Sequence, residues 1–229
     1  MNIVKYLQAQ GIGSRQFCRL LLSQNRVAIN GCTPPDDIAD TNTSLHLTID
    51  GKVLSVLPLP KFYILLNKPA NYETSHKPTH YPSVFSLLPT HWQNLNIQAV
   101  GRLDADTTGV LLLTNDGQFN HFLTSPKNHI TKLYHATLKH SANDDLCQQL
   151  MNGVLLHDEN ETVRALSATL LTPTLLALEI DSGKYHQVKR MIAACGNRVA
   201  QLHRQSFAKL TATDVAQGQW RLVSQTEIV

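Results

Sequence analysis

The chain has 229 residues, of which 42% are hydrophobic and 16% are charged, and its formal net charge is only +3 at pH 7. This length is enough for one large domain or for a small and a large domain. The four widely spaced cysteines form no cluster with histidine, so the sequence predicts neither a metal site nor a disulfide framework. Because no apolar run is long enough to cross a membrane and the chain opens without an apolar signal segment, we expect a reduced, cytoplasmic protein without a membrane partner.

The basic residues are unevenly distributed along the chain. Residues 1–35 and 182–213 contain lysine and arginine, and residues 117–143 contain three lysines, but none of the three segments contains aspartate or glutamate. Any one of these segments alone would be an ordinary solvated surface. Three of them together favour a polyanionic partner, with lysine and arginine placed on its phosphates.

Two short helices are predicted at the start of the chain. The first carries Ile3, Val4 and Leu7 on one face and is stopped by the glycines of residues 11–13. Ser14 is a favourable N-cap for the second helix. In that second helix the apolar residues and the arginines are expected on opposite sides, with Phe17, Leu20 and Leu21 on one side and Arg15 and Arg19 on the other.

A small sheet is predicted after these helices. Residues 27–29 read as a short strand that ends in a strong turn signal, Asn30-Gly31. Residues 45–49 then alternate between apolar and polar, and Asp50-Gly51 predicts a hairpin into a strand at 53–56. Two prolines make residues 57–60 a stiff linker.

The first 58 residues resemble an S4 domain, a small RNA-binding module. The resemblance rests on Gly11-x-x-Ser14-Arg15 and on Arg26-Val27-x-x-Asn30-Gly31, although the usual Arg-Leu-Asp-Lys opening is replaced by Asn-Ile-Val-Lys. It implies that RNA is contacted by four basic residues: Lys5, Arg15, Arg19 and Arg26. We therefore place a domain boundary after residue 58.

The remainder of the chain alternates between apolar strands and short helices. A strand at 62–66 is followed by Asn67-Lys68-Pro69, where proline ends it. Short helices are predicted at 118–123 and 142–151, and one opens within 183–191. Further strands are predicted at 110–113, 132–138, 162–171, 175–180, 199–202, 209–211 and 220–223.

The stretch at residues 101–117 holds the most informative pattern in the chain. It reads Gly-Arg-Leu-Asp-Ala-Asp-Thr-Thr-Gly, then an apolar run, then Thr-Asn-Asp-Gly. Asp104 therefore stands on a short polar loop at the mouth of an apolar strand, where a side chain is held rigidly yet stays reachable. A structural hairpin with a turn-forming aspartate is the alternative for a shorter match.

This stretch resembles the central motif of the pseudouridine synthases, in the branch that modifies ribosomal RNA. Three further matches support the resemblance: Asn67-Lys68-Pro69, Lys132-x-Tyr134, and Gly183-x-x-x-Gln187-Val188-Lys189. It implies that Asp104 is the catalytic nucleophile, that Tyr134 lies against the target base, and that Lys189 pairs with Asp104. Arg102 is a secondary candidate for that cation, and Lys68, Lys132 and Arg190 are expected to bind RNA. Asp106 is expected to be a structural loop residue.

The two resemblances together predict an α+β protein. An S4-like domain at 1–58 would precede a catalytic domain at 59–229, built on a mixed, largely antiparallel sheet with flanking helices. The implied reaction converts uridine to pseudouridine and needs no cofactor, and we expect a monomer. The third motif is more similar to that of the small-subunit enzymes than to that of the large-subunit enzymes. Large-subunit ribosomal RNA as the substrate, and a non-catalytic S4-type factor of ribosome assembly, remain the alternatives.

Overall fold

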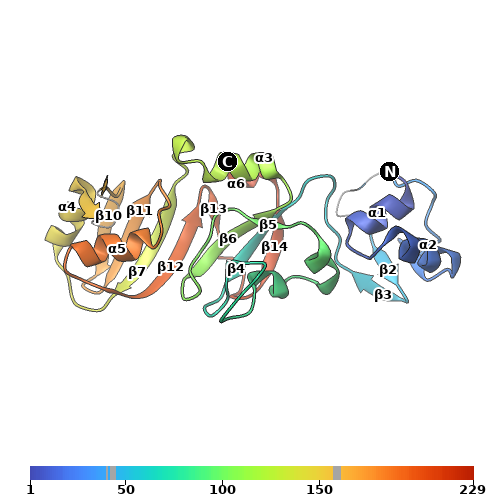
Figure 1. Cartoon of the computed structure of the whole chain (residues 1–229), viewed down its shortest axis with the longest axis horizontal. Helices are drawn as coiled ribbons and strands as arrows, with labels where there is room; N and C mark the ends of the chain where they lie inside the picture. Colours follow the sequence, from blue (N-terminus) through green and yellow to red (C-terminus); the bar gives the residue numbers. More distant parts are fainter. Residues whose placement is uncertain (40, 42–44, 157–160) are drawn as a thin grey trace.

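Two short helices and a three-stranded sheet form the N-terminal end of an elongated molecule (Figure 1). The structure is a computed structural model and describes residues 1–39, 41, 45–156 and 161–229. The helices are α1 (Ile3–Ala9) and α2 (Arg15–Ser23), and the strands are β1 (Val27–Ile29), β2 (Leu47–Ile49) and β3 (Lys52–Leu54), antiparallel in the order β1-β2-β3. As predicted, Ser14 caps α2, because its hydroxyl accepts a hydrogen bond from the amide of Phe17.

The buried side of α2 differs from the predicted one. Cys18 and Leu21 are buried in the small N-terminal core, whereas Phe17 and Leu20 are 43% and 47% exposed. Cys18 and Leu21 are three residues apart, so they share the face of the helix that packs on α1, whereas Phe17 and Leu20 lie beside this face. The exposed Phe17 and Leu20 therefore belong to the surface of this unit.

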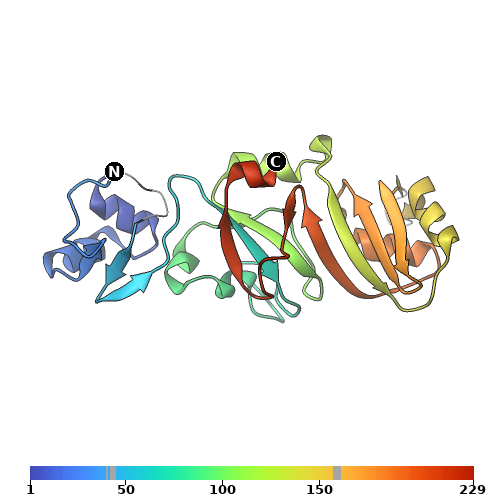
Figure 2. The same ribbon diagram turned by 180° about the vertical axis from the view of Figure 1, so that it is seen from behind.

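A nine-stranded sheet runs through the rest of the molecule (Figures 1 and 2). Its strand order is β10-β11-β7-β12-β6-β4-β14, with β13 paired to β12 and β5 to β6. All of its pairs are antiparallel except β12 with β6, which confirms the predicted mixed, largely antiparallel sheet. The bounds are β4 (Tyr63–Lys68), β5 (Gln98–Ala99), β6 (Thr108–Thr114), β7 (Lys132–Leu138), β10 (Ser167–Thr172), β11 (Leu175–Ile180), β12 (Val199–Phe207), β13 (Leu210–Thr211) and β14 (Trp220–Val223).

Helices cover the sheet at two places. In Figure 1, α3 (Gly117–Thr124) and α6 (Gln225–Ile228) lie over its middle, while α4 (Asp144–Asn152) and α5 (Gln187–Ala194) lie at the end far from the N-terminal unit. Two predicted strands have different bounds. The strand expected at 62–66 continues to Lys68, and residues 161–163 form β9 in a separate hairpin with β8 (Val154–Leu156), not the start of β10. No helix in the described part of the chain is long and apolar enough to span a bilayer.

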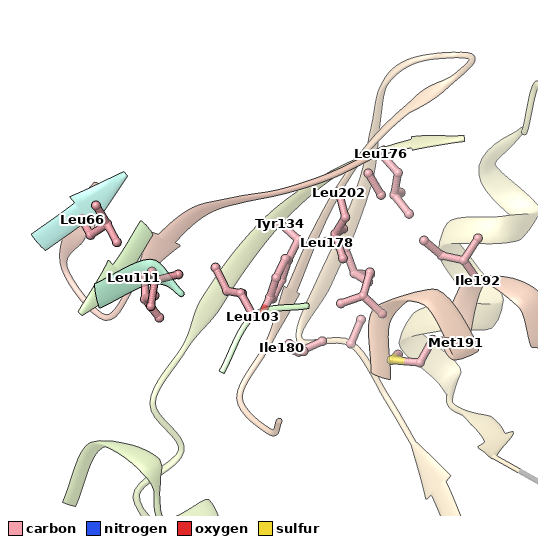
Figure 3. Packing of buried hydrophobic residues seen from close by; sticks show 14 of the residues in the cluster. Leu66, Leu103, Leu111, Tyr134, Leu176, Leu178, Ile180, Met191, Ile192 and Leu202 are labelled. Carbon is pink, nitrogen blue, oxygen red and sulfur yellow. The ribbon is translucent and has the colours of Figure 1, made fainter. Parts of the chain in front are cut away.

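The middle strands of the sheet are buried on both faces. In β4 and β6, Leu66 and Leu111 point into the larger core, whereas their neighbours Leu65 and Leu112 point into a second core on the opposite face. This is why these strands read as continuous apolar runs in the sequence. Figure 3 shows part of the larger core, in which Tyr134 lies beside apolar side chains of the strands around it.

Candidate active site

The loop before β6 is fixed by a close approach of two strands. Gly109 pairs with Arg204 in the only parallel junction among the described strands of the large sheet, and its φ is +105°. A Cβ at this position would lie 2.2 Å from the carbonyl oxygen of Arg204, so no other residue fits without moving the backbone. The glycine in the Thr-Thr-Gly motif therefore sets the path of the loop that carries Asp104.

Lys68 holds the same loop through hydrogen bonds to its backbone. Its side chain is completely buried, and Nζ donates hydrogen bonds to the carbonyl oxygens of Pro69 (3.0 Å), Ala105 (3.1 Å) and Thr107 (2.8 Å). Burial lowers the pKa of Lys68 to about 8, although the carboxylates of the loop act in the opposite direction. The predicted RNA contact of Lys68 is wrong, because protein encloses its ammonium group.

Asp104 is held between two nitrogen groups. Nζ of Lys189 donates to Oδ2 at 3.0 Å, and Nε2 of His186 lies 3.2 Å from Oδ1. The side chain of Asp104 is 30% exposed and that of Lys189 is 26% exposed. The carboxylate is thus partly dried and still accessible, and the predicted contact between Asp104 and Lys189 is present.

Asp106 shares the same lysine. Its two carboxylate oxygens accept hydrogen bonds from Nζ of Lys189 at 2.7 and 2.9 Å. Burial raises the pKa of Asp106, but the hydrogen bonds and charge of Lys189 outweigh this effect, so the pKa is lowered. Burial lowers the pKa of Lys189, and the two carboxylates more than reverse this, so its pKa is raised. Asp106 was expected to be a structural loop residue, and its hydrogen bonds to Lys189 are a contact that the sequence analysis did not predict.

His186 is the site residue that the sequence analysis missed. It precedes α5 in the left-handed backbone conformation, with φ 47° and ψ 31°, and its ring stacks on that of Tyr185 at 3.8 Å. The buried Gln187 fixes this turn, since its Oε1 accepts from the amide of Lys184 at 2.9 Å and its Nε2 donates to Ser182 at 2.8 Å. Its place directly before Gln187-Val188-Lys189 could have indicated a site residue, but the sequence does not show that the backbone of His186 is left-handed.

A cavity of about 540 Å³ opens beside Asp104. Its floor is formed by β7 and β12, which contribute Lys132, Tyr134, Leu202, Arg204 and Phe207, and its wall by the turn before α5. Tyr134 is 8% exposed and lines this cavity, as its predicted role requires. Arg102 also lines the cavity but forms no ion pair with Asp104, so the expected secondary cation does not contact the carboxylate.

The remaining predicted RNA contacts fall into two groups. Lys5, Arg15 and Arg19 are exposed on the helices of the N-terminal unit. Arg26 is exposed too, but it forms a two-point ion pair with Asp50 at 2.6 and 2.7 Å.

Lys132 and Arg190 are more enclosed. Lys132 is half-buried, and Nζ donates to the carbonyl oxygens of Ile130 at 2.6 Å and Asp181 at 3.2 Å. Arg190 is half-buried and donates to the carbonyl oxygen of Tyr185 at 3.0 Å. Within the described residues, no group of three or more histidine, cysteine, aspartate or glutamate side chains could hold a metal ion.

The chain is similar to proteins of known class over its whole length. Residues 62–194 match the family model described as RNA pseudouridylate synthase. "Ribosomal small subunit pseudouridine synthase A" of Yersinia pestis is 37% identical over 231 residues, covering 100% of this chain and 97% of that protein, and the protein of the same name from Escherichia coli (strain K12) is 36% identical, covering 100% and 98%.

Solved structures of the same fold agree with these sequence matches. A solved structure titled "Crystal structure of pseudouridylate synthase" has a TM-score of 0.70 and 30% identity, covering 100% of this chain and 98% of the other. A more distant structure, the archaeal box H/ACA sRNP Nop10-Cbf5 complex, has a TM-score of 0.51 over 67% of this chain and 50% of the other, at 16% identity, and shares the fold alone.

Proposed function

The chain belongs to the RNA pseudouridylate synthase family, and we propose that it converts one uridine of small-subunit ribosomal RNA to pseudouridine with Asp104 as the catalytic nucleophile. The observation that carries this proposal is the carboxylate of Asp104, which lies at a cavity between Lys189 and His186. The named substrate of relatives that match the entire chain supports the choice of RNA. A non-catalytic binding factor would not need a partly buried carboxylate held beside two nitrogen groups at a cavity.

The reaction requires a nucleophile that is ionised at neutral pH. The bond between ribose C1′ and uracil N1 breaks, the base turns, C5 bonds to C1′ and loses its proton, and N1 takes up a proton, so the net change is an isomerisation without oxidation or reduction. Lys189 would hold the carboxylate of Asp104 in position at 3.0 Å, and Asp106 would hold Lys189. Asp104 would either add to the uridine or take a proton from its ribose.

The target base has to leave its stack to reach this carboxylate. Taking a nucleotide out of a helix or loop costs on the order of a few kcal/mol, and stacking on an aromatic side chain offsets part of that cost. Tyr134 supplies an aromatic ring at the cavity floor, and we propose that it stacks on the flipped uracil and assists the departure of the C5 proton.

The N-terminal unit is proposed to bind RNA outside the cavity as an S4-like domain. Lys5, Arg15 and Arg19 are exposed there, as phosphate-binding side chains need to be. We also propose a monomer that acts in the cytoplasm on ribosomal RNA during subunit assembly.

The proposal is tested by comparing Asp104→Asn with its matched neighbour Asp106→Asn. Both variants lose one negative charge next to Lys189, but only the first removes the proposed nucleophile. Pseudouridine is mapped by chemical labelling and primer extension after incubation with small- and large-subunit ribosomal RNA. We expect Asp104→Asn to lose at least about 10³-fold in rate, and Asp106→Asn to lose no more than about tenfold.

RNA binding by both variants is measured in parallel and should be retained. Substantial turnover by Asp104→Asn would refute the nucleophile. Modification of large-subunit RNA alone would refute the substrate while leaving the chemistry intact.

A further inference from the structure

Arg204 is a buried cation at the floor of the cavity. It lies on β12, is 3% exposed, and donates from Nε to the carbonyl oxygen of Val110 at 2.7 Å. Its guanidinium carbon lies 5.0 Å from the centre of the Phe207 ring. A shift in register between Arg204 and Ser206 places Arg204 and Phe207 on the same side of β12, although they are three residues apart, and both line the cavity.

The guanidinium keeps donors without partners. Among the described residues, Nε is the only atom of this group that makes a hydrogen bond, and Nη2 is buried with no partner at all. No described carboxylate forms an ion pair with Arg204. A buried charge that lacks a counterion, and whose Nη2 lacks an acceptor, is unfavourable, so its retention at a cavity indicates an acceptor that arrives from outside.

The position of Arg204 defines where this acceptor would lie. Arg204 is the direct cross-strand neighbour of Tyr134, and residues in such pairs have Cα atoms about 4.5–5.5 Å apart. A base that lies against the ring of Tyr134 is therefore within reach of the guanidinium. Lys132, paired with Phe207 in the same register, adds a second positive charge to the cavity floor.

We propose that Arg204 is a catalytic residue that donates a hydrogen bond to a carbonyl oxygen of the target uracil and stabilises the negative charge of that ring when its bond to the ribose breaks. The proposal rests on the function proposed above and adds the group that receives the base. When C1′–N1 breaks, the electron pair passes into the uracil ring and spreads over its carbonyl oxygens. The ring uses this pair to form the new bond from C5 to C1′, C5 then loses its proton, and N1 takes up one proton, so that no atom is gained or lost overall.

The chemistry of the two partners agrees with this role. A guanidinium has five N–H donors and no acceptor, so it donates to a carbonyl oxygen and forms no hydrogen bond with an amino group, which is itself a donor. The O4 of uracil is an acceptor, whereas the corresponding group of cytosine is a donor. A preorganised cation at the place where charge develops accelerates a reaction more than it tightens ground-state binding. The loss of Arg204 should therefore appear mainly in the rate of the chemical step.

A cycle between Arg204→Lys and modified substrates tests the contact. The probes are a small-subunit RNA fragment that the wild type modifies and two copies with 2-thiouridine or 4-thiouridine at the target, because sulfur is a weaker acceptor than oxygen. Single-turnover rates are measured by chromatography of the digested nucleosides. We expect one thio substitution to slow the wild type by about 10- to 100-fold, and to slow Arg204→Lys by less than about threefold beyond the effect of the variant itself.

Two results overturn the proposal. One is a wild type that processes both thio substrates within about threefold of uridine, which decides the matter even if the variant does not fold. The other is that the rate effects of Arg204→Lys and of both thio substitutions are independent of each other. Coupling of Arg204 to a methylphosphonate beside the target nucleotide would have the same consequence, because the guanidinium would then bind the RNA backbone and not the base. A wild type that is inactive on every ribosomal RNA fragment contradicts the proposed function itself and is seen before the cycle begins.

Discussion

Basic side chains lie both around Asp104 and in the N-terminal unit, but their surroundings differ. Lys68 and Lys189 have defined protein partners at 2.7–3.1 Å and are fully or largely buried. Arg15 and Arg19 are exposed on one helix. A buried cation in a fixed hydrogen-bond network holds neighbouring groups in place, whereas an exposed cation is available for phosphates. The role of a lysine or arginine in this protein is therefore set by its burial, and this difference is open to direct tests.

Lys189 is expected to give the largest effect of these cations. In Lys189→Met, Asp104 and Asp106 lose the cation that they share, the carboxylate of Asp104 is no longer held in position, and kcat should fall by about 100-fold or more while RNA affinity changes little. Lys189→Arg keeps the charge and should lose less than about tenfold. Single-turnover rates and filter binding separate the two quantities. Equal losses in the Met and Arg variants would mean that side-chain shape, and not charge, matters at this position.

Lys68→Met should give an intermediate effect of a different kind. Three carbonyl oxygens, two of them in the loop that carries Asp104, lose their donor. We expect a loss of about 1–3 kcal/mol in the free energy of unfolding together with a lower kcat. Denaturant titration measures the first and single-turnover kinetics the second. A variant that binds RNA more weakly but keeps its stability and rate would restore the RNA-contact interpretation of this residue.

The strands and the main carboxylate of this protein were accessible from sequence, whereas the partners of that carboxylate were only partly so. The apolar runs at β4 and β6 are long and uninterrupted because both faces are buried, which makes them visible in any sequence. His186 was missed because its approach to Asp104 depends on a left-handed turn fixed by Gln187. Lys68 was misassigned because its motif shows that a lysine is present but not that three backbone carbonyls enclose it.

Arg15 and Arg19 should affect binding and leave chemistry intact. Replacing both with alanine is expected to weaken RNA binding by about tenfold at low salt and to lower the slope of log affinity against log salt by roughly one to two. Arg26→Ala is the matched control, because Asp50 already neutralises this arginine, and its effect should be smaller. If all three positions behave alike, or if the salt slope does not change, the N-terminal unit is not the electrostatic part of the RNA-binding surface.

The smallest effect is expected at Glu73, in the loop that braces the catalytic loop through Thr74 and Leu103. The backbone amides of Tyr81, His80 and Thr79 donate to its carboxylate and lower its pKa to about 2, from 4.5 without them.

Because the folded-state pKa is depressed, the stabilisation by Glu73 is present above pH 4.5 and is lost as the pH falls toward 2. The difference in Tm between the wild type and Glu73→Gln should therefore be greatest near neutral pH and vanish in acid. Arg26 lowers the pKa of Asp50 in the N-terminal unit through one exposed ion pair, so the corresponding effect of Asp50→Asn should weaken with added salt. The effect of Glu73 rests on backbone donors and should persist in salt. A Glu73→Gln difference that is equally sensitive to salt, or independent of pH, would show that the two regions hold their carboxylates by the same means.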